Sequence, residues 1–345
     1  MNARHALALA VTMGDPAGIG PEIIAKAFRD APELMRGCFV AGDIGTLRRA
    51  AAIVQGEGVP LPVAELAHAA DALGAPPRCV PVLQVMPPLT PVPFGQVSAL
   101  AGRAAGDCVF WAARAALRGE VGAIVTAPLH KEALSAAGAP YSLYPGHTEL
   151  LQAVAAEHLG VPVAELPVRM MLANDELRTV LVSIHVSLRD AIESVTASNI
   201  LQTLRITHQS VGAALQKTVR IGVAGLNPHA GEGGLFGREE IEAIAPAIAQ
   251  ARAEGIDARG PFAPDTVFMR GRGFKEFDVV VAMYHDQGLI PVKYLGVEQG
   301  VNVTLGLPFV RTSPDHGTAF DIAGQGIADP ASLLAAVAMA RQLSK

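Results

Sequence analysis

Short apolar runs alternate with helix-like patterns from one end of the chain to the other. Runs rich in Val, Ile and Ala without polar alternation indicate strands that are buried on both faces of a sheet. Longer stretches with apolar residues at helical spacing indicate crossover helices, and this order predicts a mostly parallel sheet. We expect strands at residues 7–13, 38–42, 121–126, 178–184, 219–225 and 279–283, and helices at residues 23–28, 96–118, 150–158, 195–216, 238–254 and 331–343.

Two regions have weaker patterns. Residues 56–95 are rich in Pro, Ala and Val, and we interpret them as short strands and loops. Residues 260–266 (GPFAPDT) are predicted to form a loop. We find no internal repeat and no linker, so a two-domain chain would pass between its domains more than once.

The stretch 278–324 carries the densest set of polar groups. Its first strand ends at YHDQG, residues 284–288, and ligands of open α/β sheets bind beyond the carboxyl ends of strands. The cationic and amide side chains that follow are suited to an anionic ligand. They are Lys293, Asn302 and Arg311, and the segment HGTAFDIAG comes after them.

Three histidines have the same placement, each within a few residues of the end of an apolar strand. They are His185, His229 and His285. One such histidine is more often structural, but three imidazoles with an open position form a familiar catalytic metal site. Asp265 and Asp286 would orient a ligand, bind metal or act as a base, and the alternative for each is a turn or cap residue.

A second group of polar residues would form a pocket for a small polyanionic molecule. It consists of His147 and Thr148 together with Lys293, Asn302 and Arg311, each of which alone is typical of a solvated surface. A divalent cation nearby would acidify an alcohol of that molecule. Since no side chain accepts a hydride, an oxidation there requires a nicotinamide cofactor.

The glycine-rich segment GDPAGIGPE, residues 14–22, precedes a predicted helix. Such a turn lets a ligand approach the backbone at a helix N-terminus, where negative charge is favoured. An ordinary tight turn explains the same residues, and the sequence leaves both readings open.

Composition and charge exclude several classes of protein. The chain of 345 residues has a formal net charge of -5 and no basic stripe, which argues against nucleic-acid binding. Three widely spaced cysteines suit a reducing cytoplasm. No apolar stretch approaches the ~20 residues of a membrane span. The sequence also lacks GxGxxG after the first strand, the P-loop, GxSxG and HExxH.

Taken together, six segments resemble one enzyme family over nearly the whole chain. The chain is similar to the 4-hydroxythreonine-4-phosphate dehydrogenases of vitamin B6 biosynthesis. HGTAFDIAG also resembles the adenosine-binding loop of isocitrate and isopropylmalate dehydrogenases. The segments are GDPAGIGPE (14–22), TAPLHK (126–131), PGHTE (145–149), GLNPHAGEGG (225–234), AMYHDQGLIPVKY (282–294) and VNVTLGLPFVRTSPDHGTAFDIAG (301–324).

The resemblance implies a three-layer α/β/α fold with a mostly parallel sheet, similar to isopropylmalate dehydrogenase. Its two subdomains would have the active site in the cleft between them. Residues 1–130 and 300–345 would form the cofactor side, and residues 131–299 the substrate, metal and dimerisation side. The enzyme would be a cytoplasmic homodimer with the active site at the subunit interface.

The resemblance also implies a reaction and the residues that carry it. The 3-hydroxyl of 4-phosphooxy-L-threonine is oxidised by NAD or NADP, and the resulting β-keto acid loses CO2 to leave 3-amino-2-oxopropyl phosphate. An acid such as Asp321 favours NAD. By this resemblance, a divalent metal (Zn, Co, Mg or Mn) is bound by His185, His229 and His285. The substrate is contacted by His147, Thr148, Lys293, Asn302 and Arg311, and the adenosine of the cofactor by Gly317, Thr318 and Asp321. The catalytic candidates are Asp265 and Asp286.

Other functions remain open at this stage. Relatives in the family oxidise other phosphorylated hydroxy acids, such as 4-phosphoerythronate, or aromatic dihydrodiols. The segment around residues 159–166 is longer than expected for the biosynthetic enzyme. More distant alternatives are a three-histidine metal hydrolase, which leaves HGTAFDIAG unexplained, and a non-catalytic binding module, which has no need of the three histidines.

Overall fold

The computed structural model describes residues 7–55, 59–296 and 299–344. The chain forms two compact units. The first unit is the chain up to Pro167 together with Leu307–Ser344, and the second unit is Val168–Gly306. The chain therefore passes between the units twice. Their boundaries fall after residues 167 and 306, whereas the sequence placed them after residues 130 and 299.

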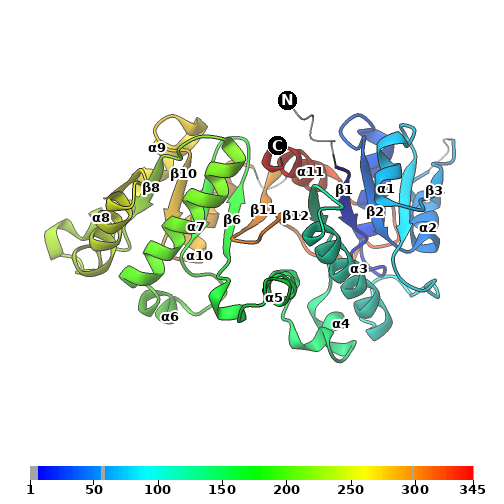
Figure 1. Cartoon of the computed structure of the whole chain (residues 1–345), viewed down its shortest axis with the longest axis horizontal. Helices are drawn as coiled ribbons and strands as arrows, with labels where there is room; N and C mark the ends of the chain where they lie inside the picture. The colour runs from blue at the N-terminus through cyan, green and yellow to red at the C-terminus, as the bar shows by residue number, and fades with distance from the viewer. Residues whose placement is uncertain (1–6, 56–58, 297–298, 345) are drawn as a thin grey trace. The chain divides into compact units, whose positions relative to one another are not determined.

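The first unit contains a parallel sheet with the strand order β3-β4-β2-β1-β5-β12 (Figure 1). Helix α3 packs on β1, β2 and β5 and carries α4 and α5, while α1, α2 and α11 form the other helical layer. The elements are β1 (Leu9–Thr12), α1 (Gly20–Asp30), β2 (Cys38–Gly42), α2 (Ile44–Val54), β3 (Val63–Glu65), η1 (Ala69–Gly74), β4 (Val80–Gln84), α3 (Ala99–Leu117), β5 (Ala123–Thr126), α4 (Lys131–Ala136), η2 (Tyr141–Leu143), α5 (His147–Leu159), η3 (Val163–Glu165), β12 (Val310–Pro314) and α11 (Ala331–Leu343).

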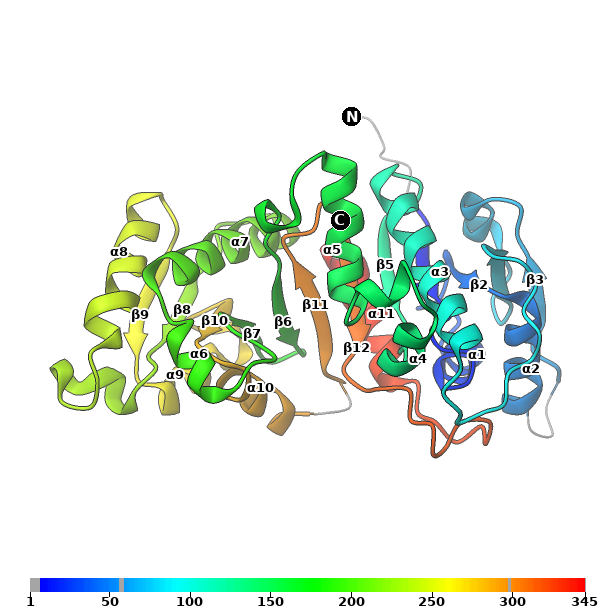
Figure 2. The same ribbon diagram turned by 90° about the horizontal axis from the view of Figure 1, so that it is seen from below.

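The second unit has the strand order β11-β6-β7-β10-β8-β9. Strand β6 is antiparallel to both β11 and β7, and the remaining pairs are parallel. Helices α7 and α8 cover one face, and α9 and α10 cover the other (Figure 2). The elements are β6 (Arg169–Ala173), β7 (Arg178–Leu181), α6 (Leu188–Glu193), α7 (Ala197–Leu215), β8 (Ile221–Ala224), η4 (Pro228–Gly234), η5 (Glu240–Ile244), α8 (Ala245–Ala253), β9 (Ala258–Phe262), α9 (Pro264–Gly271), η6 (Arg272–Phe274), β10 (Val279–Ala282), α10 (His285–Tyr294) and β11 (Val301–Leu305).

The apolar runs form strands where the sequence predicts them. All residues of β1, β2, β5, β7, β8 and β10 are buried, which is why these strands show no polar alternation. The loop predicted at residues 260–266 is wrong, because β9 ends and α9 begins there. Helix α5 begins at His147 rather than at residue 150, and α10 begins at His285, inside the polar run at residues 284–288.

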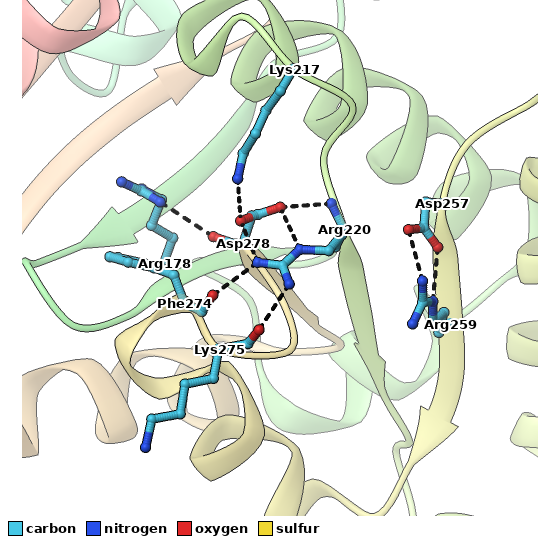
Figure 3. Close-up of polar contacts among 8 residues, drawn as sticks. All are labelled: Arg178, Lys217, Arg220, Asp257, Arg259, Phe274, Lys275 and Asp278. Carbon is cyan, nitrogen blue, oxygen red and sulfur yellow. Dashed lines mark hydrogen bonds and ion pairs between the residues drawn. The ribbon is translucent and has the colours of Figure 1, made fainter.

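The second unit contains a buried anion at the amino end of β10. Asp278 is 2% exposed, and its carboxylate accepts hydrogen bonds from Lys217 Nζ at 2.8 Å and from the backbone N–H of Arg220 at 3.0 Å (Figure 3). The Arg220 guanidinium donates two more, at 3.1 and 2.9 Å, and also binds the carbonyls of Phe274 and Lys275. This cluster joins the starts of β8 and β10, the two strands that lead to His229 and His285.

Within the described ranges, no helix is both long and apolar enough to cross a membrane.

Candidate active site

Three neighbouring parallel strands of the second unit each lead into one of the predicted metal-binding histidines. The strands are β7, β10 and β8, in that spatial order. His185 follows β7, His285 is the first residue of α10 beyond β10, and His229 lies in η4 beyond β8. Because parallel strands end at the same edge of a sheet, the three imidazoles belong to one edge of the second unit.

Two of the three imidazoles lie close together. The ring centroids of His185 and His285 are 5.7 Å apart, whereas the ring of His229 lies beside Phe236, with centroids 6.2 Å apart. Over the part of the chain that the structure describes, no three His, Cys, Asp or Glu side chains are close enough to hold a metal ion. The structure thus brings together His185 and His285 but not His229, and the three-histidine ligand set stays a prediction.

The chemistry of this edge still fits a divalent metal. His285 Nδ1 lies 2.7 Å from Asp286 Oδ1, so the Nδ1–H tautomer donates to the carboxylate and leaves Nε2 as a lone-pair donor. Histidine ligands in metal sites are commonly oriented by such a second partner. Asp286 is thereby placed to orient His285, one of the roles predicted for it.

Two cavities of the second unit meet at this edge. The smaller one, of about 250 Å³, is lined by His185, His285 and Asp286. The larger one, of about 710 Å³, is lined by His229, Asp265 and again Asp286. Tyr284 also borders both cavities. The two catalytic candidates therefore face the same hollow as His229, although Asp265 belongs to a helix that the sequence did not predict.

Two residues that the sequence reasoning missed hold the strand ends in place. Glu240 is 4% exposed and accepts hydrogen bonds from the backbone N–H groups of Leu226 and Asn227 at 2.7 and 2.8 Å, at the start of the His229 loop. Gln287 accepts from Met283 N–H at 2.7 Å and donates to the Gly225 carbonyl at 2.8 Å. Glu240 lies outside the motifs of the sequence. Gln287 belongs to the motif at residues 282–294, but its hydrogen-bond partners appear only in the folded chain.

The remaining predicted substrate residues of the second unit lie in regular structure. Lys293 is half-buried in the last turn of α10, and Asn302 is half-buried on β11 opposite Leu172 of β6.

In the first unit, the buried Arg311 acts electrostatically on the half-buried His147. Arg311 is 3% exposed, and its Nε and Nη2 donate to Thr126 Oγ1 at 3.1 and 2.7 Å. Burial lowers the pKa of Arg311 to about 10, an effect that the charge of Glu149 opposes, so the group remains cationic at neutral pH. Burial, followed by the positive charge of Arg311, holds the pKa of His147 well below its usual range.

This pair is suited to an anion. The imidazole of His147 is neutral at pH 7, and its buried Nε2 has no hydrogen-bond partner among the described residues. Thr148 is the next residue in the first turn of α5, where the backbone N–H groups of a helix favour negative charge. A buried guanidinium beside such a turn fits a phosphate or carboxylate.

The predicted cofactor loop, HGTAFDIAG at residues 316–324, also lies in the first unit, between β12 and α11. Gly317 and Asp321 are exposed, whereas Thr318 is 7% exposed and its carbonyl accepts a hydrogen bond from Ile19 N–H at 3.0 Å. Phe320 of the loop stacks on His130, with ring centroids 4.6 Å apart. Of the three residues that the resemblance assigns to adenosine, Gly317 and Asp321 are therefore exposed and Thr318 is buried.

Polar atoms beside this loop lack partners. Thr12 Oγ1, Asp15 Oδ2 and His130 Nδ1 are buried without a hydrogen-bond partner among the residues that the structure describes. Burial raises the pKa of Asp15, although the Ala17 N–H and the charge of His130 act in the opposite direction. Since buried polar atoms are normally hydrogen-bonded, their position at the carboxyl ends of β1 and β5 fits a polar ligand such as a nicotinamide cofactor.

Comparison with known proteins is decisive for the family. The sequence profile of the family described as "Pyridoxal phosphate biosynthetic protein PdxA" matches residues 34–340. The chain belongs to this family. It is 54% identical to the 4-hydroxythreonine-4-phosphate dehydrogenase of Beijerinckia indica over 336 residues, which cover 97% of this chain and 94% of that one.

Other PdxA relatives carry a different name. The chain is 43% identical to the D-threonate 4-phosphate dehydrogenase of Salmonella typhimurium over 344 residues, covering 97% of this chain and 98% of the relative. The crystal structure of 4-hydroxythreonine-4-phosphate dehydrogenase from Klebsiella pneumoniae matches with a TM-score of 0.86 at 40% identity, covering 99% of this chain and all of that one (100%).

Membership of the PdxA family confirms three expectations from the sequence. The resemblance to the family is correct, the chain is a dehydrogenase, and its fold is the mixed, mostly parallel α/β fold of the solved PdxA structures. The names of the relatives differ in their substrates, so family membership alone does not choose between the substrates.

Proposed function

We propose that this protein oxidises 4-phosphooxy-L-threonine at its 3-hydroxyl with NAD as the hydride acceptor and a divalent metal as cofactor. The β-keto acid then loses CO2 to give 3-amino-2-oxopropyl phosphate. The observation that carries the proposal is the 54% identity, over nearly the whole chain, to a relative named for this substrate. NADP remains the alternative hydride acceptor.

The geometry of the second unit supports the alcohol-oxidising part. His185, His229 and His285 would hold the metal, which when bound stabilises the alkoxide form of the alcohol and the carbonyl oxygen of the keto acid. Since Asp286 is engaged by His285, we assign the 3-hydroxyl proton to Asp265, which lines the same cavity as His229. The C3 hydrogen would leave as hydride, for which the nicotinamide cofactor, when bound, supplies the acceptor.

The electrostatics of the first unit support an anionic substrate. Arg311 presents a buried cation, and His147 and Thr148 offer a neutral imidazole and a helix N-terminus. Lys293 and Asn302 would also contact the substrate. Gly317, Thr318 and Asp321 would hold the adenosine of the cofactor. We further propose a homodimer with its active site at the subunit interface.

The sister reaction on another phosphorylated hydroxy acid is the second candidate. It is favoured by the 43% identity to the D-threonate 4-phosphate dehydrogenase of Salmonella typhimurium. That reaction would keep every role assigned to the metal and the cofactor, and it differs only in the group at C2.

The test is NADH formation by purified, metal-loaded protein, with 4-phosphooxy-L-threonine, D-threonate 4-phosphate and 4-phosphoerythronate offered in parallel. We expect the first substrate to be turned over fastest and a chelator to abolish the reaction. Faster turnover of either other substrate would replace the proposed substrate while keeping the chemistry. Turnover of none, despite bound metal, would refute the dehydrogenation of a phosphorylated hydroxy acid.

His229→Ala distinguishes a metal-dependent enzyme from a protein that only binds the phosphorylated molecule. An enzyme of this mechanism loses turnover but keeps binding of the phosphorylated substrate, because Arg311 and His147 are untouched. Unchanged turnover would show that His229 has no role in the chemistry.

A further inference from the structure

The glycine-rich segment 14–22 contacts the amino-terminal end of the cofactor loop. Besides the hydrogen bond from Ile19 N–H to the Thr318 carbonyl, Gly18 packs directly against Thr318. A Cβ at Gly18 would lie 2.9 Å from both the Cβ and the carbonyl oxygen of Thr318, closer than side chains come. The glycine therefore allows the loop to approach the start of α1.

Glu22 holds the same loop at its other end. Its side chain is 1% exposed in the first turn of α1, and its two carboxylate oxygens accept the backbone N–H groups of Gly324 and Gly326, the latter at 2.8 Å. Both glycines have positive φ, 83° and 68°. A carboxylate with two backbone donors makes charge-assisted hydrogen bonds, which are about twice as strong as neutral ones.

Further contacts fix the carboxyl-terminal end of the loop. A Cβ at Gly324 would collide with the ring of Phe94, and the Arg49 guanidinium lies 3.7 Å from the centroid of that ring. The charge of Glu22 acts on Arg49 as well, raising a pKa that burial lowers. One turn later in α1, Lys26 Nζ donates to the Ala328 carbonyl at 2.6 Å.

We infer that Glu22 is a positioning residue for the dinucleotide cofactor. It binds the backbone of residues 324–326 and thereby fixes the loop whose Thr318 and Asp321 hold the adenosine. The inference rests on the proposed function, because that function assigns the loop to the cofactor. It also gives the glycine-rich segment a role that differs from both earlier readings: the helix start binds a loop of its own chain, and that loop binds the ligand.

Glu22 acts by ordering the loop before the cofactor binds. Without the carboxylate, the segment around Gly324 and Gly326 gains conformational freedom, since glycine with positive φ has the most backbone entropy to lose. Binding the cofactor must then order the loop, and the affinity falls by the free energy of that ordering. Chemistry after binding is unaffected, because Glu22 touches neither the hydride nor the proton.

The decisive variant is Glu22→Gln. It keeps the side-chain volume and one acceptor oxygen, but its NH2 group faces a backbone donor. We expect the Kd for NADH, measured by NADH fluorescence with metal-free protein and no substrate, to rise about tenfold. The KM for NAD should rise in parallel, while kcat at saturating NAD stays within about twofold of wild type. Hydrogen exchange at Gly324 and Gly326 should become faster.

Glu240→Gln is the matched control, because Glu240 is an equally buried carboxylate that accepts two backbone N–H groups in the second unit. Its Kd for NADH should remain within about twofold of wild type. Glu22→Asp keeps the charge on a shorter side chain and should give an intermediate Kd for NADH. If Glu22→Gln does not fold, the Kd of Glu22→Asp compared with wild type tests the inference instead. A wild-type Kd in the Glu22 variants would overturn the inference and leave the proposed function standing. Failure of wild-type protein to bind NADH or NADPH would overturn both.

Discussion

Replacing Asp278 by Asn should destabilise the second unit in a way that depends on pH. Asp278 is 2% exposed and is bonded by Lys217 and Arg220 (Figure 3). Burial alone would raise the pKa of its carboxyl group, but the hydrogen bonds from Arg220 and Lys217 outweigh burial and hold that pKa well below its usual range. The carboxylate form is therefore the one that stabilises the folded state.

The magnitude follows from the bonds that are lost. A hydrogen bond to a charged group contributes about 1.5–3 kcal/mol, but Lys217 and Arg220 are 49% and 34% exposed and recover part of this from water. The side-chain oxygen of Asn at this position also still accepts a hydrogen bond. We therefore expect Asp278→Asn to lower the free energy of unfolding by about 2–3 kcal/mol at pH 7.

The pH dependence has a definite sign. Because the folded-state pKa of Asp278 is lower than the value of about 3.9 in the unfolded chain, its contribution is complete above that value and decreases as the pH falls below it. The difference between wild type and variant should shrink by about 1 kcal/mol between pH 7 and pH 3.

Urea unfolding followed by circular dichroism measures both effects. With a slope of about 3 kcal/mol per M, the midpoint of Asp278→Asn should fall by about 1 M at pH 7. The control is Asp257→Asn, which breaks the neighbouring pair with Arg259 at 2.9 Å, whose side chains are 31% and 52% exposed (Figure 3). It should change stability by less than about 0.5 kcal/mol. Equal midpoints for the two variants, or a difference that does not change with pH, would refute the reasoning.

Three predictions concern the candidate site. Glu240→Gln should weaken binding of Zn or Co by about tenfold in calorimetry, because the two hydrogen bonds to the loop that carries His229 lose the negative charge that strengthens them, and the new NH2 group would face Asn227 Nδ2; equal affinity would exclude this role. Arg311→Lys should lower kcat/KM for the phosphorylated substrate by about 100-fold, since an ammonium cannot bind Thr126 and an anion in one plane; a value near wild type would contradict a direct contact. His147 should show no titration by NMR between pH 6 and 8, because burial and Arg311 lower its pKa and keep the ring neutral throughout; a midpoint near 6.5 would disprove its burial beside a cation.

Periodicity predicted most of the fold for a simple reason. A strand with both faces covered requires an unbroken apolar run. Such runs alone located β1, β2, β5, β8 and β10 in the sequence. The same runs placed His185, His229 and His285 each after a strand, and the structure shows that these strands, β7, β8 and β10, are parallel neighbours. The family was recognised from long motifs rather than from these physical patterns.

The contacts between distant segments were decided only by the tertiary structure. The antiparallel strand β6 and helix α9 escaped prediction, because pairing partners and capping geometry, rather than periodicity, define them. The pKa of His147 is lowered first by burial and then by the charge of Arg311, which is far away in the chain. Glu22 and Glu240 read as ordinary helix acids in the sequence. Burial of a carboxylate against backbone donors is a property of packing, and no local pattern of residues records it.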